Sequence, residues 1–341
     1  EGWHLLSPPL GDIDLLTYFD SNCSICDTTS CSQVDSAYSG TGFYVESDGD
    51  PETIRFEDGV VLPYDNYSLH HGWNLIGNPL VTPVDINSVQ VDGYNWPLAV
   101  DLEIIAPTPI IFDNIKSGHT GTDLISTAAG FWVYSYEDNV NISFDPTNMP
   151  PEIEPSLYWN LSLFAKENVE PEYEKEVIGS EIVIGIHEEA NDAFIDGEDQ
   201  FNLPLEQFSS LNSYQTQISI INNELSSIYR DIRSNDDELT TWYISIDSEE
   251  LSESDSVAIE LSWDISDDNH PDLPYPDIEP SHSNYPYEFT LYVDQTPIPM
   301  NSGSSTTIVL YDIDGNGHIE SQENGGVRIE AELKDEYIGC T

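Results

Sequence analysis

Short runs of alternating apolar and polar residues recur along the chain, and turn-forming residues separate them. Over the first 149 residues the runs are bounded by Gly, Pro, Asn and Asp, and helical spacing of apolar residues is scarce. Period-two alternation places successive side chains on opposite faces of a strand, so the pattern predicts an all-β protein. From residue 156 onward we expect strands near 158–165, 181–187, 240–247, 256–263, 289–293, 306–311 and 327–333.

Two pairs of motifs in the first part of the chain repeat one another. Gly-Trp-His-Leu-Leu at 2–6 returns as Gly-Trp-Asn-Leu-Ile at 72–76, and Gly-Phe-Tyr-Val at 42–45 returns as Gly-Phe-Trp-Val at 130–133. In both copies the glycine of the second motif lies fourteen residues before a phenylalanine that closes a β-like run. Agreement in two motifs and one spacing predicts a duplicated β unit.

The duplication predicts the domain boundaries. We expect a first β repeat at 1–65 and a second at 66–149, packed together, each a small barrel or sandwich. The proline-rich segment 150–155 is expected to be a stiff, extended linker. Residues 156–341 then predict an antiparallel β-sandwich of the Ig-like or jelly-roll type.

Each repeat also predicts a local hairpin and a set of buried aromatic residues. In the second copy, the runs 130–133 and 142–144 flank a bend at 137–139, so we expect them to pair as a hairpin. The aromatic residues of the motifs are expected to pack in the core rather than to stack on a ligand. These residues are Trp3, Phe43, Trp73 and Phe131.

The charge of the chain is extreme, because 64 acidic residues face 8 Lys and Arg, for a formal net charge of −56. Self-repulsion of this size opposes a compact state unless counterions screen it. A salty habitat and bound divalent cations both fit, and the two are compatible. Nucleic acid is excluded as a partner because its phosphates would be repelled. The sequence contains no run of eighteen apolar residues, so we expect no membrane insertion.

The repeated motifs resemble modules of secreted bacterial cell-surface proteins, especially those of the Bacteroidetes-type secretion system and related marine lineages. The resemblance lies in Gly-Trp-Asn-Leu-Ile-Gly-Asn-Pro at 72–79 and in the Gly-Phe-Tyr-Val and Gly-Phe-Trp-Val motifs. The stretch 184–199 is similar to the β-sandwich that follows such modules. The resemblance implies a modular, secreted or cell-surface protein without catalytic residues of its own. The chain begins at Glu1 inside a motif, which is expected of a processed or partial chain.

Four cysteines form a cluster near one end of the chain and a single position near the other. Their spacing lacks the second Cys or His pair of a zinc site, so an exported protein is expected to use them as disulfides. Three pairings within one chain are open, and each full pairing joins one cysteine of the cluster to the last cysteine. Alternatively, that last cysteine bonds a neighbouring subunit. The residues are Cys23, Cys26, Cys31 and Cys340.

The segment 312–323 matches the twelve-position calcium loop of EF-hands and dockerin-like repeats. A hard cation takes six to eight oxygen ligands, and Gly317 at position 6 permits the sharp turn. The β-like flanks predict the loop without paired helices; an Asp/Gly-rich turn in an acidic chain is the other interpretation. The predicted ligands are Asp312, Asp314, Asn316, His318 through its backbone carbonyl, Glu320 and Glu323.

A second acidic cluster places four carboxylates within eight residues. It is either a second calcium site or a solvated acidic loop, so Ca²⁺ is the cofactor that the sequence predicts. The residues are Asp192, Asp196, Glu198 and Asp199.

No catalytic motif stands out in the sequence, and we expect no enzyme. A Gly-x-Ser-x-Gly elbow and a phosphate-binding loop are absent, and the run from His187 to Asn191 lacks the second His of a zincin. The sequence predicts an extracellular structural or adhesive surface protein, such as a filament or surface-array subunit, that associates with itself or other surface proteins. The alternative is a carbohydrate-binding region of a secreted polysaccharide-degrading enzyme, stacking glycans on Tyr94, Trp96, Tyr275 and Tyr287.

Overall fold

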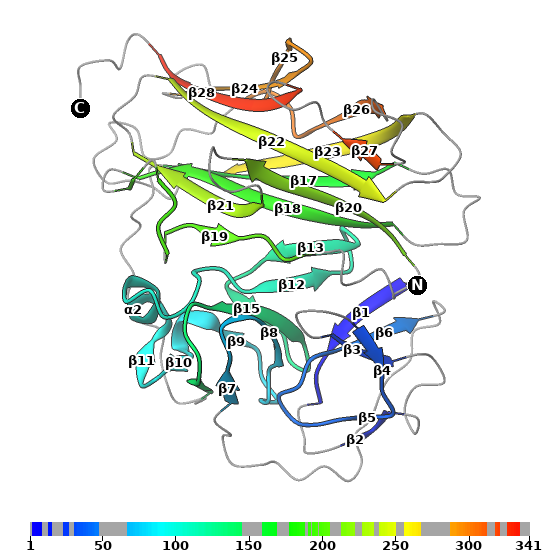
Figure 1. Cartoon of the computed structure of the whole chain (residues 1–341), viewed down its shortest axis with the longest axis vertical. Helices are drawn as coiled ribbons and strands as arrows, with labels where there is room; N and C mark the ends of the chain where they lie inside the picture. The colour runs from blue at the N-terminus through cyan, green and yellow to red at the C-terminus, as the bar shows by residue number, and fades with distance from the viewer. Residues whose placement is uncertain are drawn as a thin grey trace. The chain divides into compact units, whose positions relative to one another are not determined.

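The fold is that of a computed structural model, built almost entirely of β-strands (Figure 1). The all-β prediction is therefore confirmed. The chain divides into two compact units: unit 1 contains Glu1–Glu152 and Leu203–Ser213, and unit 2 contains Ile153–Asn202 and Tyr214–Thr341. The structure describes residues 2–8, 13–15, 23–26, 31–47, 67–144, 159–168, 177–187, 190–191, 193–196, 198–204, 213–221, 227–234, 239–249, 256–266, 287–311, 318–320 and 326–334.

Unit 1 contains short strands in several small sheets, and its sheets do not close into a barrel over the described residues. The strands of the first repeat are β1 (Gly2–Leu6), β2 (Ile13–Asp14), β3 (Cys23–Cys26), β4 (Cys31–Gln33), β5 (Ser36–Ala37) and β6 (Phe43–Ser47). The second repeat has β7 (Tyr67–Leu69), β8 (Gly72–Gly77), β9 (Val84–Asp85), β10 (Gln90–Val91), β11 (Tyr94–Asn95), β12 (Ile110–Asp113), β13 (Gly118–Gly121), β14 (Leu124–Ile125), β15 (Gly130–Ser135) and β16 (Val140–Ser143).

The two repeats pair their motif strands in the same register. Strand β1 pairs with β6 so that Leu6 lies opposite Phe43, and β8 pairs with β15 so that the equivalent Ile76 lies opposite Phe131. The small ladders β2–β5 and β9–β14 also correspond, since Ala37 and Ile125 take the same place in each repeat. The duplication in the sequence is thus matched by a duplication of strand pairing.

The repeats are also joined by contacts that come in equivalent pairs. At the end of β1, Leu6 bridges to Ala129, the residue before β15, and near the end of β8, Ile76 bridges to Thr41, two residues before β6. Two hydrogen bonds correspond in the same way: the Ser7 N–H donates to the carbonyl of residue 128 over 2.8 Å, and the Gly77 N–H donates to that of residue 40 over 2.7 Å. In each repeat, backbone groups at the end of the first motif strand therefore bond to the other repeat.

The hairpin predicted in the second repeat is wrong. Strand β15 pairs with β8 and β12, whereas β16 pairs with β7 and β10 in a different sheet. The bend at Asn139 has a left-handed φ of 63°, and beyond it the chain crosses to the second sheet. Phe131 on β15 and Phe144, the residue after β16, then pack edge to face with ring centroids 6.3 Å apart. A shared core, rather than direct strand pairing, holds these two runs together.

Two short helices, η1 (Ile86–Ser88) and α2 (Trp96–Asp101), lie between strands of the second repeat. Helix α2 begins where the Asn95 side chain accepts the Leu98 N–H over 3.0 Å, and it carries proline in its first turn. It buries Trp96 and Ala99 against the core. The predicted aromatic anchors Trp3, Phe43, Trp73 and Phe131 are all buried, as expected.

Unit 2 is an antiparallel sandwich of longer strands. One sheet runs β18–β17–β23–β26, and the other runs β21–β20–β22–β28–β24–β25, with β27 pairing to both β22 and β26 and short parallel ladders joining β18 to β20 and β21. The strands are β17 (Trp159–Glu167), β18 (Val177–Ile186), β19 (Gln200–Phe201), β20 (Tyr214–Ile221), β21 (Ile228–Arg233), β22 (Leu239–Glu249), β23 (Ser256–Ser266), β24 (Tyr287–Val293), β25 (Thr296–Pro299), β26 (Ser305–Tyr311), β27 (His318–Glu320) and β28 (Val327–Leu333).

The core of unit 2 follows from the alternation in its sequence. On β17, Trp159, Leu161 and Leu163 face inward, and on β22 the buried Trp242 and Ile244 flank the exposed Tyr243. The ring of Trp159 packs edge to face on Trp242 at 5.7 Å between centroids. All seven strands expected in this region are present, whereas β19, β20, β21, β25 and β27 were not predicted.

Candidate functional site

The predicted calcium loop lies mostly outside the described residues. Within 312–323 the structure describes only β27, whose backbone pairs with β22 so that Glu320 lies opposite Asp247 and His318 opposite Glu249. A residue that binds through its backbone carbonyl, as expected for His318, is compatible with a strand. The roles of Asp312, Asp314, Asn316, Glu320 and Glu323 remain predictions.

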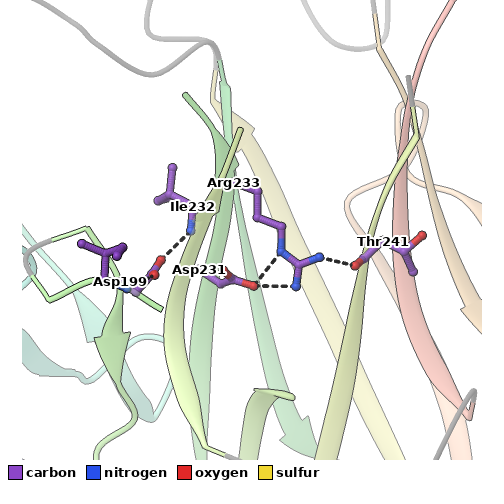
Figure 2. A network of polar contacts seen from close by, with 6 residues as sticks. Asp199, Asp231, Ile232, Arg233 and Thr241 are labelled. Atoms are coloured by element: carbon purple, nitrogen blue, oxygen red, sulfur yellow. Dashed lines mark hydrogen bonds and ion pairs between the residues drawn. The ribbon is translucent and has the colours of Figure 1, made fainter. Parts of the chain in front are cut away.

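The second acidic cluster is partly described, and its central residue is Asp199. This side chain is fully buried, and its two oxygens accept backbone N–H groups from two different segments. Oδ1 accepts from Ile232 on β21 over 2.9 Å, and Oδ2 accepts from Ile195 over 2.8 Å. Figure 2 shows the first of these bonds, which fastens the acidic loop to β21. The carboxylate therefore serves as a staple for the loop.

The surroundings of Asp199 favour its neutral form. Burial raises the pKa of the Asp199 carboxyl to about 7, and the nearby carboxylates of Asp231 and Glu198 act in the same direction, against the two N–H donors. Burial also raises the pKa of Glu198, whose Oε1 accepts the Asn191 N–H over 3.0 Å. Both carboxylates are thus already engaged by backbone donors of their own loop.

Next to this staple, β21 carries an ion pair. Arg233 donates from Nε and Nη2 to one oxygen of Asp231 at 3.0 and 2.8 Å, and from Nη1 to the Thr241 carbonyl at 2.7 Å (Figure 2). The guanidinium also lies 5.3 Å from the centre of the Trp242 ring. These contacts tie β21 to β22 across the sheet, and the sequence did not single them out.

A calcium site in this second cluster therefore remains a prediction. Asp192 lies outside the described residues, and Asp196 forms a backbone bridge to Asp199. In the part of the chain that the structure describes, no three His, Cys, Asp or Glu side chains gather closely enough to hold a metal ion. What the described geometry does accomplish is to fix the loop on the sandwich.

Unit 1 contains a buried polar group of its own, where the two repeats meet. Tyr44 on β6 and Trp132 on β15 hold the same position of the repeated motif, and the Trp132 Nε1–H donates to the Tyr44 oxygen over 2.9 Å. The Tyr44 hydroxyl lies 2.8 Å from His119 Nε2 on β13. All three side chains are almost fully buried. Two equivalent residues of the duplication therefore touch through one hydrogen bond.

Burial decides the protonation of this group. It lowers the pKa of His119 to about 3, and it raises the pKa of the Tyr44 hydroxyl, against the donor from Trp132. At neutral pH His119 is uncharged, which lets Nε2 accept from the Tyr44 hydroxyl. The arrangement is suited to holding strands together, because neither group has access to solvent. Sequence inspection missed His119, since one histidine in a β run carries no motif.

The aromatic residues expected to stack on glycans have different surroundings. The expectation for Trp96 is wrong, because this side chain is buried by helix α2 and donates from Nε1 to the Pro107 carbonyl over 2.9 Å. Tyr287 is half-buried and packs on Trp159, with ring centroids 5.6 Å apart. Tyr94 is exposed, and Tyr275 lies outside the described residues.

An aromatic row that the sequence did not indicate crosses the outward face of unit 2. Tyr243, Arg328 and Tyr292 lie opposite one another on β22, β28 and β24. Tyr243 is 47% exposed, and the Arg328 guanidinium lies 3.9 Å from the centre of the Tyr292 ring. Arg328 also donates from Nε to Glu330 over 2.9 Å. Cross-strand register creates this row, which residue spacing along the chain does not reveal.

The cysteine cluster forms the antiparallel ladder β3–β4. In this ladder Cys26 lies directly opposite Cys31, while Cys23 lies opposite Val45 on β6. Directly opposed residues of antiparallel strands have Cα atoms about 4.5–5.5 Å apart, within the span of about 4.4–6.8 Å that a disulfide bridges. Cys340 lies outside the described residues.

Comparisons with protein families, with curated proteins and with solved structures found no match for this chain. Over the described residues, no helix has the length and apolar character needed to cross a bilayer.

Proposed function

We propose that this chain is a secreted structural or adhesive protein of the cell surface, a subunit that associates with itself or with other surface proteins. The observation that carries the proposal is the use of polar groups in both units. Asp199 fastens a loop to β21, Arg233 joins β21 to β22, and Tyr44 joins the two repeats. Buried and partly buried polar groups that connect strands are expected of a scaffold.

The resemblance to secreted bacterial surface modules supports the same proposal. The net charge of −56 makes both folding and association of this chain dependent on cations in this proposal. Calcium in the 312–323 loop, and divalent ions between acidic faces, would offset repulsion within and between subunits. Self-association is therefore proposed to need calcium or high salt.

The ladder β3–β4 supports a Cys26–Cys31 disulfide in the exported protein. Extracellular oxidant, either dioxygen or a protein disulfide, takes up the two electrons that leave the thiols. Cys23 then remains for Cys340, in the same chain or in a neighbouring subunit, and the second pairing would cross-link an assembly.

The proposal is tested by electron microscopy and light scattering of the chain at high concentration, with calcium and then with EDTA. Ordered polymers or arrays that form with calcium and disperse with EDTA are expected. Monodisperse monomers under both conditions, in low and in high salt, contradict self-assembly.

A second candidate function, glycan binding, is supported by the row Tyr243–Arg328–Tyr292. Aromatic rings and polar groups on an exposed sheet face are suited to sugar rings and hydroxyls. Because the chain is strongly acidic, a neutral glycan is favoured over an anionic one. A glycan array with calcium present tests this, and Tyr243→Ala is expected to weaken any retained glycan, with Tyr311→Ala, an exposed tyrosine on β26, as the matched control. Retention of no glycan removes this candidate.

A further inference from the structure

The core of unit 2 ends in a layer of polar side chains. Glu167 is the last residue of β17 and follows the inward-facing Leu163 and Ala165 on the same side of the strand. Thr216 on β20 and Ser248 on β22 lie opposite each other in the facing sheet. All three polar residues are at most 2% exposed. Where the alternation predicts another apolar residue, the chain therefore places a carboxylate between the two sheets.

Hydrogen bonds fix this layer across the sandwich. Ser248 Oγ donates to Glu167 Oε2 over 2.7 Å, and the Glu167 N–H donates to Thr216 Oγ1 over 3.0 Å. Ser180 on β18 extends the layer, because its hydroxyl donates to the Thr216 carbonyl over 3.0 Å and accepts the Ile218 N–H over 2.9 Å. Four neighbouring strands thus contribute oxygen atoms to one region.

One oxygen of this layer has no partner. Glu167 Oε1 is buried without any hydrogen bond, and among the described residues no Lys, Arg or His side chain pairs with this carboxylate. Burial raises the pKa of Glu167, against the hydrogen bond from Ser248. An ionised carboxylate with an open oxygen in a protein core is costly, so such a group either takes up a proton or is accompanied by a positive charge.

We propose that Glu167 Oε1 binds a monovalent alkali cation, with the hydroxyl oxygens of the layer as neighbouring hard ligands. The charge selects the ion, because one buried carboxylate neutralises one positive charge, whereas a divalent ion would leave a net charge in the core. Oxygen donors are the ligands that hard cations prefer. The site is distinct from the predicted calcium loop, whose carboxylates suit a divalent ion.

The test measures unfolding of the whole chain by urea in NaCl and in choline chloride at equal ionic strength, without divalent ions. Choline screens charge equally but is too large for a buried site. At one specific site, a tenfold rise in sodium is expected to raise the folding constant up to tenfold. Glu167→Gln is expected to abolish this dependence, while Glu330→Gln, a carboxylate outside the core, retains it.

Sodium NMR relaxation on the wild-type chain gives an independent measurement that does not require a folded variant. Fast sodium relaxation that potassium displaces competitively supports the site. Equal folding constants in sodium and choline overturn the proposal, as does a sodium dependence that Glu167→Gln retains.

Discussion

At the scale of single residues, both units use buried polar side chains to connect segments of the chain, but the side chains differ in chemistry. Unit 1 buries the neutral pair Tyr44 and His119, and unit 2 buries the carboxylates of Asp199 and Glu167. In each case one polar side chain connects segments far apart in the sequence. The hydrogen bonds that these groups make matter for stability, because a buried polar group that loses its partner costs about 1–3 kcal/mol.

Removal of the Tyr44 hydroxyl tests this reasoning. Tyr44→Phe leaves Trp132 Nε1 and His119 Nε2 without their shared partner, so we expect the free energy of unfolding to fall by about 2–4 kcal/mol. Urea unfolding followed by tryptophan fluorescence measures the change. Tyr94→Phe, at an exposed position of the same unit, is the control and is expected to change little. Equal stability of both variants would show that the buried bond contributes nothing.

At the scale of strands, the close approach of the repeats depends on two equivalent glycines. A Cβ on Gly42 would lie 2.9 Å from the Ile76 carbonyl oxygen, and a Cβ on Gly130 would lie 2.9 Å from the Leu6 carbonyl oxygen. Gly42→Ala and Gly130→Ala are each expected to destabilise the chain by about 1–3 kcal/mol, because backbone must shift. Calorimetry measures both, with Gly303→Ala as the control, since its nearest atom is 3.7 Å away. Unchanged melting of both repeat variants would mean that the strands separate at little cost.

The ladder β3–β4 makes a covalent prediction at the same scale. Cys26 and Cys31 are expected to form a disulfide in chain purified from the medium, since the register opposes them directly. Peptide mapping by mass spectrometry without reductant identifies the link. A Cys23–Cys26 or Cys23–Cys31 peptide as the main product would contradict the register argument. Cys340→Ser distinguishes a link between subunits from one within the chain, because only the former changes the mass of the complex under non-reducing conditions.

At the scale of the whole molecule, the two units are expected to respond to pH in opposite directions. His119 has a folded pKa of about 3 against an ordinary 6.5, so the unfolded chain binds the proton first and stability is lost as pH falls below 6.5. Asp199 has a folded pKa of about 7 against 3.8, so its contribution is fully present below pH 3.8 and is lost as pH rises toward 7. Each slope is at most about 1.4 kcal/mol per pH unit.

Two variants separate these slopes from the general effect of charge. Urea unfolding of wild type, His119→Gln and Asp199→Asn at pH 4.5, 5.5 and 6.5 gives the comparison, because the background repulsion is nearly the same in all three. On acidification, the contribution of His119 lowers the free energy of unfolding of the wild type, so His119→Gln is expected to lose less stability than wild type. The contribution of Asp199 raises it, so Asp199→Asn is expected to gain less stability than wild type. Parallel pH curves for all three chains would show that neither group titrates as its burial implies.

For the molecule as a whole, the sequence predicts where many strands lie but not which strands pair. Alternation predicted the all-β fold and seven strands of unit 2, because the facing of each residue is local information. It did not predict that β15 and β16 enter different sheets, since partner choice depends on contacts distant in sequence. His119 and Arg328 were missed for the same reason: their significance comes from neighbours on other strands. Trp96 was misassigned because loop-like sequence concealed a short helix.

The paired bridges between the repeats, Leu6 to Ala129 and Ile76 to Thr41, have a consequence for the pairing of separate repeats. Each repeat offers both halves of the contact, which is the form of an interface between two identical molecules related by a twofold axis. Two separate copies of one repeat, each with both halves of the contact, would therefore be able to pair in the same way as the two repeats of this chain. Within one chain the two repeats can differ in sequence, as they do at the motif position that is Tyr44 in the first repeat and Trp132 in the second.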